Sequence, residues 1–448
     1  MLTHIFAKEQ PSAYLDTTII LKNGKGLFKS NKVLPKGLYS IYNNRRKFDI
    51  LIGENQRFGI EADTTDFIHL NRFTSSPDND AFYDFLRFDI PAQIKLRQLS
   101  EQYQNTVGDT EKKAISEQWQ ELSKERMGFI KNIVNENEGL YVSKFLKAMF
   151  VPLELPVMPP DDQYRWYRAH FFDNFNIYDP DLLRTPLYES KLTDYLTWFS
   201  RSHLPDTVCA ELDRMLTKAK ADKGVFQCVL ATILNYFSSK TELIAHDNFV
   251  VHLVDNWYVP YADWANVEEL KNFADKVRPT LIGKLAPPLE QLLVLPPDHI
   301  KAAALDTAIK NDIHVGAIIP DFRKSINSKY IAILFWDVSC SHCKSTIQGL
   351  WNVYETCKDK GLQVIALQTL RSKEGKAKWI DYLNEHGMYD WVNAWIIYDN
   401  KWHDIYIYDA GVPKIYLLNE KKEIILKGNL DPQEIQSRIE AFEGKNQE

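Results

Sequence analysis

The sequence predicts a multidomain α+β protein with an N-terminal antiparallel β module, an α-helical middle domain and a C-terminal α/β domain. Three patterns predict these parts. Apolar residues repeat with a period of two over residues 14–67, with a period near 3.6 over residues 80–276, and as alternating strands and helices after residue 288. The 448 residues suit three domains of roughly 150 residues each. We expect these domains at residues 1–78, 79–279 and 280–448.

Composition and charge exclude several classes of protein. Hydrophobic residues make up 45% and charged residues 25%, which is ordinary for a packed protein and excludes wholesale disorder. The 54 basic and 60 acidic side chains leave a net charge of −6, so we expect no basic surface for nucleic acid. No apolar run approaches the roughly 20 residues of a membrane span, so we expect no transmembrane segment in this chain.

The first part of the chain contains short predicted strands divided by turns. Asn23-Gly24, Pro35-Lys-Gly37 and Gly53-Glu-Asn55 are typical turn sequences between β-rich runs. The expected strands are Thr17 to Leu21, Gly26 to Ser30, Leu38 to Tyr42, Phe48 to Ile52 and Arg57 to Ala62. We interpret them as a small sandwich-like β domain, in which no clustered His, Cys or paired carboxylates suggest catalysis.

The middle of the chain predicts an α-helical domain of roughly 200 residues. Apolar residues recur at i, i+3, i+4 and i+7, and prolines between Pro152 and Pro186 divide the region. The expected helices are Ile94 to Tyr103, Ala114 to Ile133, Lys191 to Ser200, Val208 to Lys218 and Phe226 to Phe237. No repeat of fixed period indicates a solenoid.

Strands and helices alternate beyond the linker at Leu281 to Pro288, which predicts an α/β layer with a partly parallel sheet. A partly helical insert is expected at Leu292 to His314. The expected strands are Tyr330 to Asp337, Gln363 to Gln368, Val392 to Tyr398, Lys414 to Leu418 and Glu423 to Lys427. The expected helices are Cys340 to Lys358, Lys376 to Glu385 and Pro432 to Phe442.

The segment Cys340-Ser-His-Cys343 carries the chemistry of this domain. It follows a buried strand and opens a helix, where free backbone N–H groups and the helix dipole stabilise a thiolate. Cys343 lies one turn further on, close enough to form a disulfide with Cys340 and to resolve a mixed disulfide with a substrate. The pattern therefore predicts a redox-active dithiol.

Two other interpretations of this motif remain open. A CxxC pair can be half of a zinc site, but the nearest further ligands, Cys357 and His386, do not form a second closely spaced pair. The two thiols could also be buried and inert. We see no metal site in the sequence, and we expect Cys209 and Cys228 to be small buried hydrophobes.

The C-terminal domain resembles a thioredoxin fold. The residues that carry this resemblance are Phe335-Trp336-x-x-x-Cys340-x-x-Cys343-Lys344 and, further along, Gly411-Val-Pro413-Lys-Ile-Tyr-Leu-Leu418. The segment Gly283-Lys-Leu-Ala-Pro287 is similar to the start of the TlpA/ResA-like thiol-disulfide oxidoreductases of the bacterial envelope. Segments such as His170-Phe-Phe-Asp-Asn-Phe-Asn176 and Leu183-Arg-Thr-Pro-Leu187 resemble domains of unknown function found ahead of such modules.

The resemblance implies roles for individual residues. Cys340 matches the attacking thiol and Cys343 the resolving thiol. Pro413 matches a cis-proline that faces the dithiol, with an ordinary trans proline at a strand start as the alternative. Val412 would offer its backbone to an extended substrate peptide. Trp336 would either shield the site or only pack in the core.

Three further residues near the dithiol bear on its chemistry. The imidazole of His342 can add positive charge or a hydrogen bond beside the thiolate and make the disulfide more oxidising, or it can be solvated without effect. Thioredoxins often carry a buried acid immediately before the Phe-Trp pair, where this chain has Leu334. Asp337 is the nearest carboxylate and could substitute for that acid.

These inferences predict a thiol-disulfide oxidoreductase that exchanges disulfides with protein substrates. It needs no dissociable cofactor, only an upstream redox partner. The alternative is an envelope binding or scaffold protein with a redox-silent thioredoxin module. The resemblance implies the periplasm or cell envelope, although Met1-Leu-Thr-His-Ile-Phe-Ala7 lacks the basic leader and apolar core of a signal peptide. A truncated start would look the same.

Overall fold

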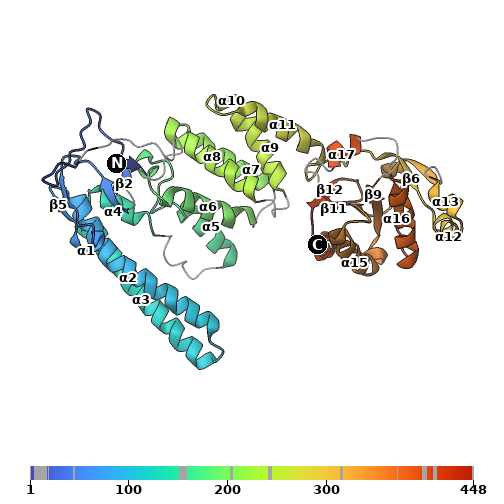
Figure 1. The fold of residues 1–448 in the computed structure, drawn as a ribbon, viewed down its shortest axis with the longest axis horizontal. Coiled ribbons are helices and arrows are strands. Elements are labelled where there is room, and N and C mark those ends of the chain that lie inside the picture. The colour runs from blue at the N-terminus through green and yellow to red at the C-terminus, as the bar shows by residue number, and fades with distance from the viewer. Residues whose placement is uncertain are drawn as a thin grey trace. The chain divides into compact units, whose positions relative to one another are not determined.

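The computed structural model describes residues 2–4, 18, 20–43, 46–150, 159–201, 205–240, 245–312, 316–370, 372–395, 401–406 and 411–445. The chain forms two compact units, Met1–Tyr236 and Phe237–Glu448. An antiparallel β module, a helical region and a C-terminal mixed sheet with helices follow one another along the chain (Figure 1). The predicted fold class is therefore confirmed. The three domain limits expected from the sequence stay a prediction.

Two small antiparallel sheets make up the β module. The first has the order β1-β2-β3 and the second pairs β4 with β5. The strands are β1 (Leu2–His4), β2 (Gly37–Asn43), β3 (Arg46–Ile52), β4 (Gly59–Glu61) and β5 (Arg72–Thr74). The run Gly26 to Ser30, expected as a strand, is a loop in which Leu27 is 72% exposed and Phe28 packs against the core of the β module. Of the expected strand at Thr17 to Leu21, Thr17 and Ile19 lie outside the described residues.

The free edge of β3 is covered by side chains of the helix α2 (Pro77–Asn105). The side chain of Asn79 accepts a hydrogen bond from the Leu51 N–H and donates one to the Leu51 carbonyl, both at 2.8 Å. The Tyr83 hydroxyl donates to the Asp49 carbonyl at 3.1 Å. These bonds stand where a further strand would pair, and they join the sheet to the first long helix.

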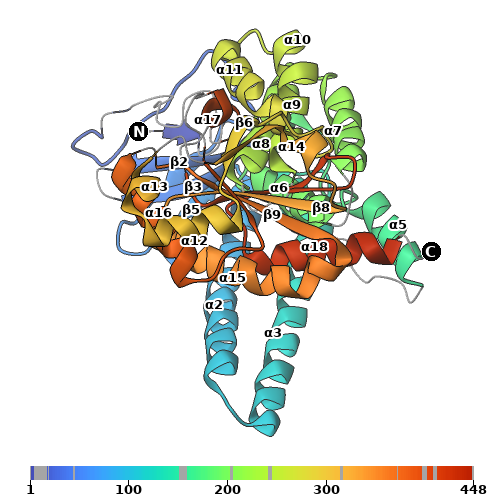
Figure 2. The same cartoon turned by 90° about the vertical axis from the view of Figure 1, so that its right-hand side faces the viewer.

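Helices α2 and α3 (Asp109–Glu136) run side by side as a long antiparallel hairpin (Figures 1 and 2). The helices expected at Ile94 to Tyr103 and Ala114 to Ile133 are central parts of these two. The remaining helices that begin in this unit are α1 (Phe67–Leu70), α4 (Tyr141–Lys147), α5 (Pro160–His170), α6 (Leu187–Arg201), α7 (Pro205–Ala219) and α8 (Lys223–Ser239).

The C-terminal domain is built on a mixed sheet with seven described strands in the order β12-β11-β8-β9-β10-β6-β7. The neighbours β8, β9 and β10 are parallel, and the other neighbouring pairs are antiparallel. The strands are β6 (Glu290–Val294), β7 (Ala317–Asp321), β8 (Tyr330–Trp336), β9 (Leu362–Gln368), β10 (Val392–Trp395), β11 (Lys414–Leu418) and β12 (Ile424–Gly428). The expected insert forms part of β6 and the two helices that follow it.

Helices cover this sheet on both faces (Figure 2). All seven residues of β8 are buried, as a central parallel strand requires. Leu334 and Trp336 pack against residues of α15, α16 and α18, whereas Ile333 and Phe335 pack against α17. The helices are α12 (Pro297–Leu305), α13 (Thr307–Asn311), α14 (Phe322–Ser325), α15 (Ser341–Cys357), α16 (Lys373–Glu385), α17 (Lys401–Tyr406) and α18 (Pro432–Lys445).

Helix α9, one of the helices that precede the sheet in the second unit, is bonded to residues of the C-terminal domain. Lys427 of β12 and Asp247 form an ion pair of 2.5 Å, and their side chains are 3% and 1% exposed. The side chain of Asn248 bonds to the carbonyl and the N–H of Ile282 at 3.0 and 3.1 Å. These helices are α9 (His246–Leu253), α10 (Val259–Tyr261) and α11 (Val267–Val277). None of the described helices is long and apolar enough to cross a membrane.

Candidate active site

The dithiol segment lies at the carboxyl end of β8, where the chain turns into α15. The apolar residues of β8 end at Trp336. A short loop follows, which is closed by a hydrogen bond from the Cys340 N–H to the Asp337 carbonyl at 3.0 Å. Cys340 is the N-cap residue of α15, and its Sγ accepts a hydrogen bond from the Cys343 N–H at 3.3 Å. The free N–H groups of a helix N-terminus therefore point toward Cys340.

The start of β11 lies against Cys340. Lys414 of β11 is opposite Phe335 of β8, which brings the preceding Val412 and Pro413 to the end of the sheet that holds the dithiol. The Cys340 thiol lies 3.9 Å from the Val412 carbonyl oxygen, to which it donates, and the Val412–Pro413 peptide bond is cis. Four residues that the sequence named are thus neighbours here, although 72 positions separate Cys340 from Val412.

The two thiols differ sharply in burial. Cys340 is partly exposed, whereas Cys343 is fully buried, and both thiols are free. Burial is the largest cause that raises the pKa of Cys343, to about 12; the hydrogen bond with Cys340 raises it further, and the backbone N–H of Asp337 acts in the opposite direction. Cys340 can therefore be reached from outside, and Cys343 is a neutral thiol at neutral pH.

The other three residues that the sequence named occupy different surroundings. His342 is exposed on the first turn of α15, where its carbonyl accepts from the hydroxyls of Ser345 and Thr346. Trp336 is fully buried in the core, and its ring lies 5.4 Å from that of Tyr382. The Asp337 carboxylate accepts from the Ser339 N–H at 2.6 Å, so it shapes the loop before Cys340.

Two contacts near the dithiol have no local signal in the sequence. Thr369 donates to the Trp336 carbonyl through its N–H at 2.9 Å and its hydroxyl at 3.0 Å, which fixes the end of β8. The Tyr382 ring packs on Trp336, and the Lys344 ammonium lies over the same ring, 5.8 Å from its centroid. Only the parallel pairing of β8 with β9 could have pointed to Thr369, because it follows the strand beside the dithiol.

The described part of the chain contains no set of side chains arranged as metal ligands. No group of three or more His, Cys, Asp or Glu residues there is arranged to hold an ion. Cys357 is buried near the far end of α15, and burial raises its pKa. Burial also raises the pKa of Cys209, to about 12. Both Cys357 and Cys209 are free thiols.

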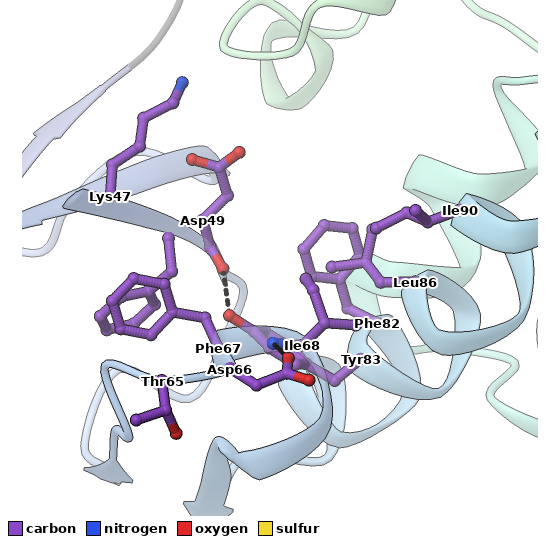
Figure 3. A pocket seen from close by; sticks show the side chains of 11 residues that line it. Lys47, Asp49, Thr65, Asp66, Phe67, Ile68, Phe82, Tyr83, Leu86 and Ile90 are labelled. Atoms are coloured by element: carbon purple, nitrogen blue, oxygen red, sulfur yellow. Dashed lines mark hydrogen bonds between the residues drawn. The ribbon is translucent and has the colours of Figure 1, made fainter. Parts of the chain in front are cut away.

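A separate cavity of about 440 Å³ lies in the β module between β3, α1 and α2 (Figure 3). Apolar side chains such as Phe67, Phe82 and Ile90 line most of it, with Asp49 and Lys47 also on its wall (Figure 3). It contains neither a thiol nor an imidazole, so it offers no group for thiol exchange.

One family model and several solved structures are similar to parts of the chain. Residues 109–281 match the family model of a domain of unknown function, DUF5106. No curated protein matches the chain. A thioredoxin-like protein from Bacteroides caccae is 18% identical, and the match covers 65% of this chain and 98% of that one with a TM-score of 0.46.

Two further solved structures are similar to shorter parts of the chain. A domain of a possible thiol-disulfide isomerase from Cytophaga hutchinsonii is 22% identical, with 38% of this chain and 97% of that chain covered and a TM-score of 0.29. A secreted disulfide oxidoreductase from Mycobacterium tuberculosis is 14% identical, with 28% and 90% covered and a TM-score of 0.23. Along the chain, the region that matches DUF5106 precedes the C-terminal domain, whose mixed sheet has a thioredoxin-like fold.

Proposed function

We propose that the protein is a thiol-disulfide oxidoreductase that exchanges disulfides with protein substrates through Cys340 and Cys343. The observation that carries the proposal is the pair of unequal thiols on the first turn of α15, with the accessible one against the Val412 carbonyl beside cis-Pro413. An accessible attacking thiol and a shielded resolving thiol are what a two-step exchange needs.

The exchange proceeds in two balanced steps. The Cys340 thiolate attacks one sulfur of a substrate disulfide, a mixed disulfide forms, and the other substrate sulfur leaves as a thiolate that takes up a proton. Cys343 then loses its proton and attacks the Cys340 sulfur, which releases the second substrate thiol. The substrate disulfide is reduced and the Cys340–Cys343 pair is oxidised by two electrons. An upstream redox partner must then reduce the pair, and the reverse sequence would oxidise a substrate dithiol.

The surroundings of Cys340 support a polypeptide as substrate. In this proposal, the backbone of Val412 pairs with an extended segment around the substrate cysteine, and Pro413 keeps that segment against the dithiol. His342 adds a donor or a positive charge on the exposed side of the pair. Trp336 supports the loop from the core side. The resemblance of the sequence to envelope oxidoreductases supports a further part of the proposal, that the protein acts in the periplasm or cell envelope.

Trapping of the mixed disulfide tests the assigned roles. A Cys343→Ser variant should accumulate covalent complexes with a disulfide-containing protein such as insulin on non-reducing gels, because attack occurs and resolution does not. Cys340→Ser is the matched control and should trap nothing. Equal trapping by both variants would contradict the roles. Thiol alkylation of the wild-type protein, after oxidation and again after reduction, shows whether the Cys340–Cys343 pair changes its redox state. A pair that does not change would favour the redox-silent scaffold.

A further inference from the structure

We propose that the helical region binds an acidic segment of a partner polypeptide at a cationic site formed by Arg168, Arg214 and Lys218. This site, here called the arginine clamp, lies on α5 and α7, drawn in shades of green in Figure 1. It is independent of the dithiol chemistry. The family model that matches residues 109–281 is of a domain of unknown function and names no ligand.

The clamp is organised by one buried carboxylate. Glu211 of α7 is 1% exposed at its side chain and accepts from Arg214 Nε at 3.0 Å and Nη2 at 2.5 Å, from Arg168 Nη2 at 2.5 Å, and from the Tyr195 hydroxyl at 2.5 Å. Burial acts to raise the pKa of Glu211, but the bonds from Arg214, Tyr195 and Arg168 lower it to about 2. The carboxylate therefore holds both guanidinium groups in fixed positions.

More positive charge is gathered here than Glu211 needs. Two arginines are bound to one carboxylate, which one cation would have neutralised, and Lys218 follows Arg214 on the same helix. In the part of the chain that the structure describes, no second carboxylate lies within ion-pair distance of Arg168 or Arg214. Lys218 is exposed and extends along α7 one turn beyond Arg214, with its ammonium 5.8 Å from the Tyr178 ring.

The unused donors of the clamp face solvent. The side chains of Arg168 and Arg214 are 42% and 43% exposed. Each guanidinium has five N–H groups, of which Arg168 gives one and Arg214 gives two to Glu211. Arg168 also lies 5.3 Å over the Phe199 ring, which holds its plane in place. Two oriented planar forks of this kind match carboxylate oxygens better than a mobile lysine does.

The spacing of the cations favours several linked carboxylates over one small anion. Arg214 and Lys218 lie four residues apart on α7, and Arg168 approaches from another helix, so a segment of consecutive acidic residues can meet all three. A free oxyanion such as inorganic phosphate could occupy only the arginine pair. The two sources of negative charge are therefore separable by experiment.

The test is a binding titration of the full chain with fluorescein-labelled hexaglutamate at low ionic strength, with labelled hexalysine as the opposite-charge probe. We expect hexaglutamate to bind and hexalysine not to bind. Lys218→Glu should weaken hexaglutamate binding about fivefold, because it reverses a charge at the rim without touching Glu211. Arg168→Gln should weaken it by about tenfold, because it removes one fork and leaves Arg214 and Tyr195 on Glu211.

Lys131→Glu is the matched control, an exposed lysine of α3 with the same charge reversal, and should change the affinity less than twofold. Equal loss in Lys131→Glu and Lys218→Glu would show that net charge alone governs binding and would overturn the proposal. Absence of hexaglutamate binding would overturn it too. Inorganic phosphate that displaces the peptide at a lower concentration than free hexaglutamate does would assign the clamp to a free oxyanion instead.

Discussion

Burial separates the two cysteine side chains of the dithiol at the scale of single residues. Cys340 caps a helix and reaches the surface, while Cys343 lies one turn deeper in the core. A thiol is a nucleophile only as its thiolate, and the first attack in the proposed exchange therefore belongs to Cys340. The proposed resolving step requires the buried Cys343 thiol to lose its proton, which burial makes unfavourable.

The raised pKa of Cys343, about 12, predicts a pH-dependent resolving step. Below that value the thiolate fraction of Cys343 grows about tenfold per pH unit, so the rate should rise by that factor across neutral pH. The measurement is release of thionitrobenzoate from a mixed disulfide preformed on Cys340, followed by absorbance. A rate that does not change between pH 6 and 9 would contradict a neutral Cys343.

Replacement of His342 tests its influence on the redox equilibrium. If its imidazole stabilises the reduced form, His342→Ala should lower the reduction potential by on the order of 30 mV, which is about 1.4 kcal/mol for two electrons. The measurement is a redox titration against glutathione. Ser341→Ala, at the other exposed position between the cysteines, is the control and should leave the potential unchanged. Equal potentials for wild type and His342→Ala would remove His342 from the site.

The parts of the site that the sequence could predict are those with local chemical signals. A CxxC pair after a buried strand indicates a helix N-terminus, and the Val412-Pro413 pair was found through its resemblance to a known motif. Tyr382 had no such signal, because its contact with Trp336 depends on how α16 packs on the sheet. Leu334 occupies the position before Phe335-Trp336 at which the resemblance suggests a buried acid. It is fully buried, so this end of β8 is apolar.

At the scale of elements, the buried pair of Asp247 and Lys427 ties α9 to the sheet edge. Lys427→Met leaves the Asp247 carboxylate without its main charge partner, so the free energy of unfolding should fall by about 3–5 kcal/mol. Urea unfolding followed by circular dichroism measures this. The double variant Asp247→Leu/Lys427→Met should recover part of the loss, since it removes both charges. A loss in the double variant as large as in the single one would contradict this account.

The same pair makes stability depend on pH at the acid side. Burial acts to raise the pKa of Asp247, but His246 and Lys427 together hold it well below its ordinary value. A carboxyl whose folded pKa is depressed stabilises the fold above its unfolded pKa, near 3.9, and loses this contribution as the pH falls through the folded pKa. The stability difference between wild type and the double variant should therefore shrink below about pH 4.

Sequence periodicity predicted the type of most elements but fewer of their limits. Segments with a strong 3.6 period, such as Ala114 to Ile133, are helical, yet this helix begins at Asp109 and continues to Glu136. The run Gly26 to Ser30 has the composition of a strand, but strand formation also needs a partner, which local sequence does not reveal. The sequence does not predict the antiparallel pair β6–β7, because the helical insert separates the two strands along the chain and no local pattern indicates that they pair.

At the scale of the whole molecule, the helices α9, α10 and α11 belong to the compact unit that holds the dithiol. A fragment of residues 237–448 should therefore melt at a higher temperature than one of residues 280–448, which lacks Asp247 and Asn248 and exposes the surface that α9 and α11 cover. Thermal unfolding by circular dichroism measures both midpoints. Equal midpoints would show that the sheet gains no stability from these helices.

The bonds between Asn79 and Leu51 also bear on how molecules of this protein meet one another. An exposed strand edge is a template on which a strand of another molecule can add, and repeated addition leads to aggregation. The amide of Asn79 fills both backbone positions of Leu51, and Tyr83 fills the Asp49 carbonyl, so this template is already occupied. Helix α2 thereby closes this edge of the first sheet to an added strand.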